Sequence, residues 1–257
     1  MPPVVPYAYS WLLVCCLLTV FLIWFTERLN KAGAVTCQYR VHPRRFAFKA
    51  GDVLLCSTSL FNRLFVQSTW GHVALVYRDP WNDMLCVWEI QIPVEGSWRA
   101  HTTSLKSQAT RLTPLYRYLD RCPKPVCVRS ISKEVNVMAF HDFIKTKWEQ
   151  PFGFEFFANA GSRIFMDIVG IPVLPRKKKS GRYCAEMVAE TLSHLGVLDF
   201  QSSLDSHVKP SRILPRDFAK NTERLPLTAG YEYGDEILLD SRGPSSGTLC
   251  SGEDERQ

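Results

Sequence analysis

The feature that most limits how this chain can fold is an apolar run near its start. Residues 11–25 read WLLVCCLLTVFLIWF and contain no charged side chain. Extended back to Pro6, the run has about the 20 residues that a helix needs to cross a bilayer. A cleaved signal peptide is the alternative, but the first ten residues contain no Lys or Arg and the small-residue stretch 32–35 lies far from the apolar run. We therefore expect an uncleaved single-pass membrane anchor over residues 1–30.

The charges around this span predict its orientation. Only the terminal amine precedes the span, whereas several basic side chains follow it, namely Arg28, Lys31, Arg40, Arg44 and Arg45. Because cytoplasmic flanks are enriched in Lys and Arg, we expect the C-terminal domain in the cytosol, with membrane lipids as its first partners.

The composition is typical of a globular protein. Hydrophobic residues make up 46% of the 257 residues and charged residues 22%, which excludes a mainly disordered or collagen-like chain. The net charge is +6, and the one tight basic cluster is residues 176–179. A solvated loop explains that cluster more simply than a nucleic-acid site, so we expect no nucleic-acid partner.

The nine cysteines are scattered along the chain, with no CxxC pair and no spacing typical of zinc ligands. An odd number of thiols in a chain with a large apolar core favours reduced cysteines over a disulfide framework. We expect no metal and no cofactor.

Strand patterns begin after residues 31–47, which resemble a linker. Short apolar or alternating runs bounded by turn residues indicate strands. These runs are residues 53–56, the segment TWGHVALVYRDP at 69–80, residues 85–92 and residues 126–131. The second and third form a predicted hairpin, which carries His72 near the beginning of its first arm and Glu89 on its second.

Two amphipathic helices are also predicted. The first begins after Ser132 and ends near Pro151, and the second covers residues 183–196 with Gly196 at its C-terminal end. The Phe-rich stretch between them could line an apolar groove or pack in the core. The tail at 243–257 lacks periodicity, and we expect it to be disordered.

Cys184 is the candidate nucleophile because it stands at the head of the second helix, directly after a basic run. Both features favour the thiolate. A nucleophilic cysteine also needs a base, and His72 is the one histidine of six on a central strand. Glu89 on the neighbouring strand could hold the imidazole. Each residue also has a purely structural interpretation, as a buried thiol, a structural histidine and a solvated carboxylate.

The combination resembles the permuted papain-like amidases of the NlpC superfamily, in particular the YiiX-like branch, where the chain order is histidine, acidic residue, cysteine. The matching pieces are GDVLLCSTS at 51–59, WGHVALVY at 70–77, CVWEI at 86–90, QPFGFEFF at 150–157 and YCAEMVAETL at 183–192. Two places depart from the family pattern, Ala185 and Phe152–Gly153, which leaves room for a changed substrate or a lost activity.

The resemblance implies an α+β domain over residues 48–242, with a circularly permuted papain-like (NlpC-type) antiparallel sheet packed against helices. It implies that Cys184 attacks a carbonyl, that His72 moves the proton and that Glu89 orients the ring. Tyr183 would position the substrate or supply a hydrogen-bond donor. The remaining candidate substrate-binding residues are Phe152, Phe154, Lys177 and Lys178.

The activity expected is that of a thiol-dependent hydrolase or acyltransferase acting through a thioester. The anchor, the basic cluster and the Phe-rich stretch favour a lipid acyl substrate. A peptide or peptidoglycan amidase of the same fold and a non-catalytic membrane-tethered scaffold remain alternatives.

Overall fold

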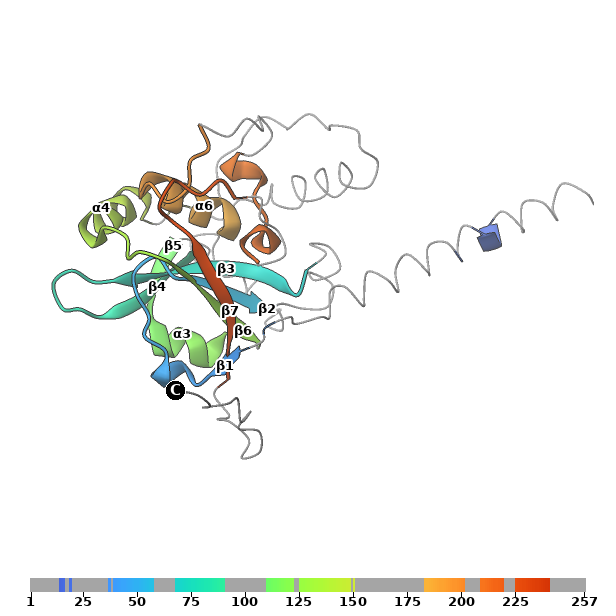
Figure 1. Cartoon of the computed structure of the whole chain (residues 1–257), viewed down its shortest axis with the longest axis horizontal. Helices are drawn as coiled ribbons and strands as arrows, with labels where there is room; N and C mark the ends of the chain where they lie inside the picture. The colour runs from blue at the N-terminus through green and yellow to red at the C-terminus, as the bar shows by residue number, and fades with distance from the viewer. Residues whose placement is uncertain are drawn as a thin grey trace, which may run out of the picture.

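A seven-stranded sheet packed with helices forms a mixed α+β fold (Figure 1). The computed structural model describes residues 14–16, 19, 37, 39–57, 68–90, 110–122, 125–148, 150, 183–201, 209–219 and 225–240.

The strand order in the sheet is β1-β7-β6-β2-β3-β4-β5. The strands are β1 (Tyr39–Val41), β2 (Val53–Ser57), β3 (Trp70–Arg78), β4 (Leu85–Ile90), β5 (Thr110–Pro114), β6 (Val126–Ile131) and β7 (Tyr233–Leu239). Every neighbouring pair is antiparallel except β1 and β7, which are parallel. The sheet is therefore mostly antiparallel, with one parallel pair at its edge.

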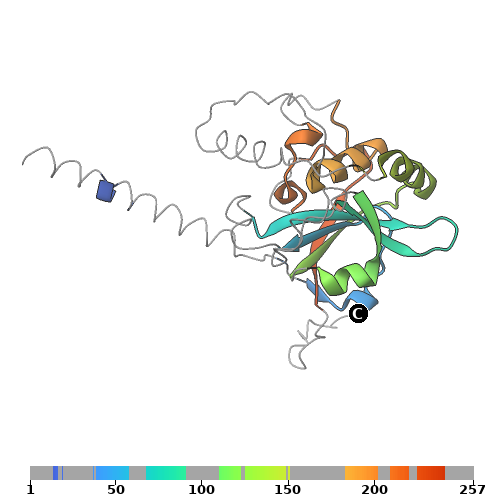
Figure 2. The same cartoon turned by 180° about the vertical axis from the view of Figure 1, so that it is seen from behind.

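Helices cover both faces of the sheet, as the two opposite views show (Figures 1 and 2). The helices α4 (Val137–Lys147) and α6 (Cys184–His194) pack on one face, and α3 (Leu115–Arg121) packs on the other. The described residues also contain the short 3₁₀ turns η1 (Pro43–Arg45), η4 (Pro210–Arg212) and η5 (Pro215–Phe218). The strands alternate accordingly, since Val73 and Leu75 of β3 belong to the α6 side and Ala74 and Val76 to the α3 side.

Helix α6 contacts β3, β4, α4 and the turn η4, and most of its side chains are buried. Its small residues Ala185 and Ala189 allow a close approach to the sheet. The indole of Trp88 on β4 donates a hydrogen bond to Thr191 Oγ1 at 3.3 Å, which fixes the helix against the strand. The helix ends at His194, and Gly196, which follows the C-cap Leu195, has a φ of +71° that suits a glycine just beyond a helix C-terminus.

The four strands and two helices expected from the sequence correspond to β2, β3, β4, β6, α4 and α6. The strands β1, β5 and β7 and the helix α3 were not expected. The stretch 31–47, expected to be a linker, contains β1, which pairs with β7. A strand of three residues is too short to show an alternating pattern, and its partner is distant in sequence.

Within the described part of the chain, no helix combines the length and the apolar character needed to cross a bilayer. Apart from residues 14–16 and 19, the expected anchor at 1–30 lies outside the described residues, and so does the tail at 243–257.

Candidate functional site

Three distant segments bring the sequence-predicted residues His72, Glu89 and Cys184 together. His72 lies on β3, Glu89 on β4 and Cys184 at the first residue of α6. The register that pairs Leu75 with Trp88 sets Glu89 diagonally across from His72 on the same face of the sheet. His72 Nε2 is 3.3 Å from Glu89 Oε2, and both side chains are largely buried.

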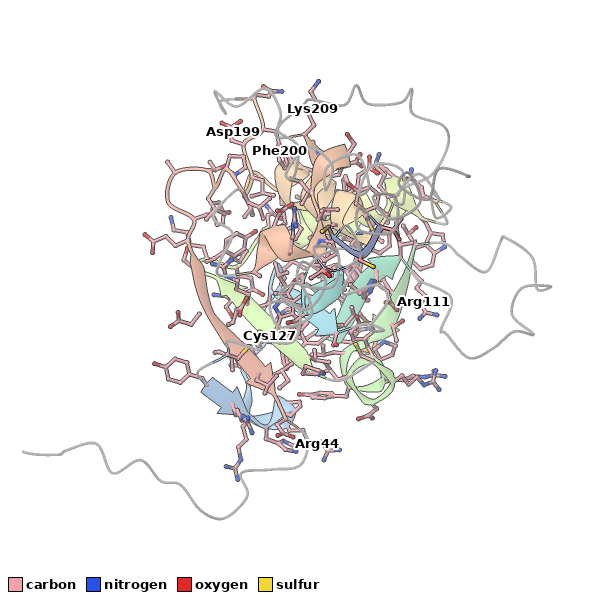
Figure 3. The ribbon with its side chains drawn as sticks, turned by 90° about the vertical axis from the view of Figure 1, so that its right-hand side faces the viewer. Arg44, Arg111, Cys127, Asp199, Phe200 and Lys209 are labelled. Atoms are coloured by element: carbon pink, nitrogen blue, oxygen red, sulfur yellow. The ribbon has the colours of Figure 1, made fainter. Side chains whose placement is uncertain are left out.

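Glu89 is held from its other side by Arg111, a residue that sequence reasoning missed. Arg111, labelled in Figure 3, lies on β5. It is directly opposite Glu89 and donates from Nε at 3.0 Å and from Nη2 at 2.8 Å to Glu89 Oε1. Burial opposes ionisation of Glu89, but its hydrogen bond and charge interaction with His72 and the charge of Arg111 outweigh it and lower its pKa. Glu89 is therefore an anion with one oxygen for the guanidinium and one for the imidazole.

His72 is the centre of the group. Burial is the largest influence and by itself lowers the pKa of His72, because it disfavours the charged ring. The charge of Cys184 and a hydrogen bond with it, together with Glu89, act in the opposite direction and raise the pKa of His72 to about 10. A histidine ring that readily holds a proton beside a cysteine sulfur is the arrangement found where a cysteine acts as a nucleophile.

The start of α6 places the Cys184 thiol at this ring. Cys184 is the first residue of the helix, and its side chain is only 2% exposed. Backbone N–H groups in a first helical turn have no acceptor within the helix, and the positive end of the helix dipole favours an anion there. The same end of the helix therefore suits a thiolate and an oxyanion.

Tyr183, the residue before the helix, is used differently from the expectation. Its hydroxyl donates to the backbone carbonyl of Ser211 in η4 at 2.7 Å, and the side chain is 2% exposed. A hydroxyl has one proton, and this one is committed to the chain. The arrangement therefore does not support Tyr183 as a donor to substrate.

A second polar group lies on the α3 side of the sheet near His72. Cys56 Sγ is 3.2 Å from the hydroxyl of Tyr118. Cys56 also forms a hydrogen bond with Cys122, and this bond lowers the pKa of Cys122 more than the charge of His72 does. Sequence reasoning left residues 95–125 unassigned. Within the described part of that stretch, residues 110–122, the place of Arg111 beside the buried Glu89 becomes visible once the register is known.

The other four candidates, Phe152, Phe154, Lys177 and Lys178, lie outside the described residues. A scan against models of known protein families finds none that matches this chain, and a search of curated proteins finds no match either.

Proposed function

We propose that this chain is a thiol-dependent hydrolase or acyltransferase with Cys184 as its nucleophile. The supporting observation is the buried His72 ring, which contacts Glu89 on one side and interacts with the Cys184 sulfur on the other. A structural histidine needs neither an oriented carboxylate nor a thiol at a helix start. A cysteine-based acyl-transfer site of the histidine–carboxylate type uses both.

The proposed reaction has two steps. The Cys184 sulfur attacks the carbonyl carbon, a thioester forms, and the C–N or C–O bond to the leaving group breaks as His72 delivers its proton to that group. Water or another acceptor then attacks the thioester, gives its proton to His72 and releases the sulfur. Glu89 holds the ring through Nε2, so Nδ1 is the atom that exchanges the proton.

Nδ1 fits this role. It is buried and makes no hydrogen bond of regular geometry within the described residues. A general base needs such a nitrogen, because one occupied by a structural donor could not accept the thiol proton. The backbone N–H groups at the start of α6 would stabilise the oxyanion of the tetrahedral intermediate.

We infer that the fold is a permuted papain-like one, of the NlpC superfamily and its YiiX-like branch. Two features support this inference: the chain order histidine, glutamate, cysteine, and a cysteine at the first residue of a helix that packs on a mostly antiparallel sheet.

A lipid acyl group is the proposed substrate class. Sequence features alone favour it, namely the apolar segment 11–25 and the candidate contacts Phe152, Phe154, Lys177 and Lys178. A peptide amide is the alternative. Mass spectrometry of an acyl adduct trapped on Cys184 in Glu89→Gln protein would decide, since a fatty acyl mass supports the lipid class and a peptidyl mass contradicts it.

Alkylation kinetics test the nucleophile. We expect iodoacetamide at pH 7 to modify Cys184 at least tenfold faster than the other buried thiols, as followed by peptide mass mapping. His72→Ala should abolish the preference, whereas Cys86→Ser, which removes a buried thiol on the other side of the sheet from His72, should not change it. Equal and slow labelling of all buried thiols would remove the basis of the proposal.

The burial of Cys184 favours a second candidate, a non-catalytic tethered scaffold on the same fold. A thiol that is 2% exposed meets a substrate only if the surrounding chain moves. If the protein is a scaffold, iodoacetamide should modify Cys184 as slowly as Cys86, and no substrate should give an acyl adduct.

A further inference from the structure

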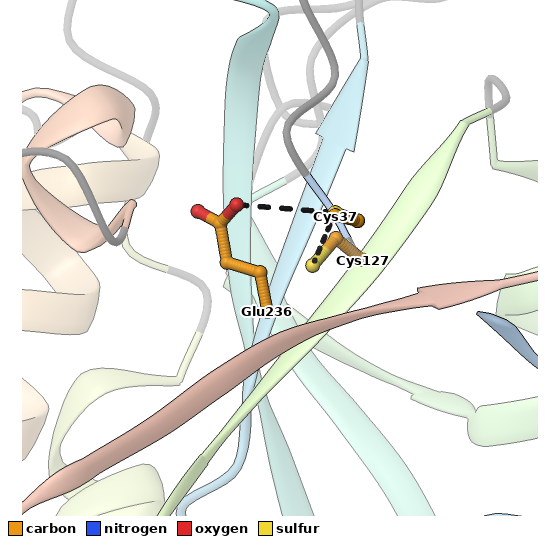
Figure 4. Close-up of side chains that lie close together, drawn as sticks. All are labelled: Cys37, Cys127 and Glu236. Atoms are coloured by element: carbon orange, nitrogen blue, oxygen red, sulfur yellow. Dashed lines mark hydrogen bonds between the residues drawn. The ribbon is translucent and has the colours of Figure 1, made fainter. Parts of the chain in front are cut away.

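A second cluster of sulfur and carboxylate ligands lies on the opposite half of the sheet. It consists of Cys37, two residues before β1, with Cys127 on β6 and Glu236 on β7, and Figure 4 shows the three side chains converging. Cys37 Sγ is 3.6 Å from Cys127 Sγ and 3.8 Å from Glu236 Oε2, and all three ligand atoms lie within 4.8 Å of one another. We name these residues the edge cluster.

The strand register explains why they meet. Cys127 pairs with Leu238, so Glu236, two residues away on β7, points to the same face of the sheet as Cys127. The parallel pairing of Tyr39 with Ile237 brings the residues before β1 alongside Glu236. Three separate segments thus contribute one ligand each, and Cys127 and Glu236 are buried whereas Cys37 is half-buried.

We propose that the edge cluster binds a zinc ion, or a similar divalent cation that prefers thiolate. A tetrahedral zinc ion places two bound sulfurs about 3.8 Å apart and a sulfur and a carboxylate oxygen about 3.5 Å apart. The distances of 3.6 and 3.8 Å in the structure are close to these values. Two thiolates and one carboxylate leave a fourth position for water.

The electrostatics of the cluster also favour a cation. Two thiolates and one carboxylate whose ligand atoms lie within 4.8 Å of one another would repel each other in the absence of a cation. A divalent ion reverses this relation, because it stabilises every anion around it. If Cys37 and Cys127 instead formed a disulfide, the negative charge of Glu236 would disfavour the thiolate that disulfide exchange requires.

The ion would fasten the segment leading from the apolar N-terminal run to the β6–β7 edge of the domain. Reading the sequence could not find the site, because Cys37 is 90 residues from Cys127 and 199 from Glu236. Known zinc spacings place at least two ligands within a few residues of each other.

The test uses the full-length chain in detergent, reduced and treated with a chelator. Zinc is titrated in competition with a chromophoric chelator, and cobalt is added separately to detect a thiolate charge-transfer band. We expect one ion per chain, a melting temperature higher by about 5 °C at saturating zinc, and a cobalt band typical of two thiolates. Cys37→Ser, at the half-buried position, should lower zinc affinity at least tenfold and halve the intensity of the cobalt band. Glu236→Gln should lower zinc affinity but leave the intensity of the cobalt band unchanged.

Two controls separate this site from the proposed active site, where Cys184 and His72 are also potential ligands. Cys86→Ser and Cys184→Ser should bind zinc as the unchanged protein does. Zinc uptake that is lost in Cys184→Ser and retained in Cys37→Ser would overturn the assignment. So would a reduced protein that takes up no zinc, whether or not Cys37 and Cys127 form a disulfide in air.

Discussion

At the scale of single residues, the environment of Glu89 decides whether His72 can act as a base. Glu89 is 4% exposed, and its charge is tolerated because His72, Arg111 and, at 3.5 Å, the Thr113 hydroxyl surround the carboxylate. Removing His72 or Arg111 would leave the buried anion less well compensated, which raises its pKa and weakens its hold on the ring.

In the proposed active site, Arg111 is therefore a positioning residue that does not contact the substrate. Its replacement should lower activity through its effect on Glu89. We expect Arg111→Gln to slow Cys184 alkylation about tenfold and to move the acid limb of its pH profile to higher pH, because Glu89 would then be protonated more easily. The alkylation rate of Arg111→Lys should lie between those of the unchanged protein and Arg111→Gln, since an ammonium keeps the charge but lacks the fixed pair of N–H groups. An unchanged acid limb in Arg111→Gln would show that the guanidinium has only a structural role.

The pKa of His72, raised to about 10, predicts a stability that depends on pH. A raised folded-state pKa means that the folded chain binds the proton more tightly than the unfolded chain, whose histidine titrates near 6.5. The contribution is fully present below about pH 6.5 and is lost as pH rises through 10. We expect the free energy of urea unfolding to fall more steeply between pH 7 and 10 in the unchanged protein than in His72→Gln. Parallel curves would contradict the ion pair.

At the scale of elements, the entry into β2 depends on one glycine. Gly51 has φ +95°, donates its N–H to the carbonyl of Val76 at 2.9 Å and packs tightly against Ile131 and Val135. A Cβ there would stand 2.7 Å from Ile131 Cδ1 and 2.8 Å from Val135 Cγ1. The left-handed backbone and the crowding both exclude a side chain.

We expect Gly51→Ala to lower the free energy of unfolding by about 3 kcal/mol, as measured by urea denaturation. Gly196 is the matched control, because it also has a positive φ, +71°, but a Cβ there meets nothing within 4 Å. Gly196→Ala should cost only about 1 kcal/mol, the price of the backbone conformation. Equal losses would mean that crowding at Gly51 is relieved by small side-chain shifts.

At the scale of the whole molecule, the two sites lie on opposite halves of one sheet. The proposed active site uses β3, β4, β5 and the start of α6. The edge cluster uses β6, β7 and Cys37, which precedes β1, and β2 separates the two halves of the sheet. We expect Cys37→Ser to leave the alkylation rate of Cys184 within about twofold of the unchanged protein, because changes that share no contacts are usually additive. A larger change would mean that the sheet couples the two sites.

The proposed membrane anchor carries a prediction at this scale, because the basic side chains that follow the apolar run favour a cytosolic C-terminal domain. We expect added protease to cleave the C-terminal domain in sealed vesicles whose cytosolic side faces out. Protection of the domain until detergent is added would instead place it on the other side of the membrane.

Local patterns in the sequence were sufficient for the central elements. Alternation predicted β3 and β4, helical periodicity predicted α4 and α6, and the position of Cys184 at a helix start followed from the same pattern. These signals are local because hydrophobic periodicity reflects which face of a single element is buried. Chemistry-bearing residues could then be selected by their place on those elements.

Pairing between distant segments was decided only by the tertiary structure. Three arrangements depend on strand register or on helix docking. They are the hydrogen bonds from Arg111 to Glu89, the hydrogen bond from the Tyr183 hydroxyl to Ser211, and the cluster of Cys37, Cys127 and Glu236. A single sequence carries no record of which strands become neighbours, because register is set by the burial of whole faces at once. The sequence by itself thus determined the candidate triad, and only packing across the sheet determined the surroundings that could make it reactive.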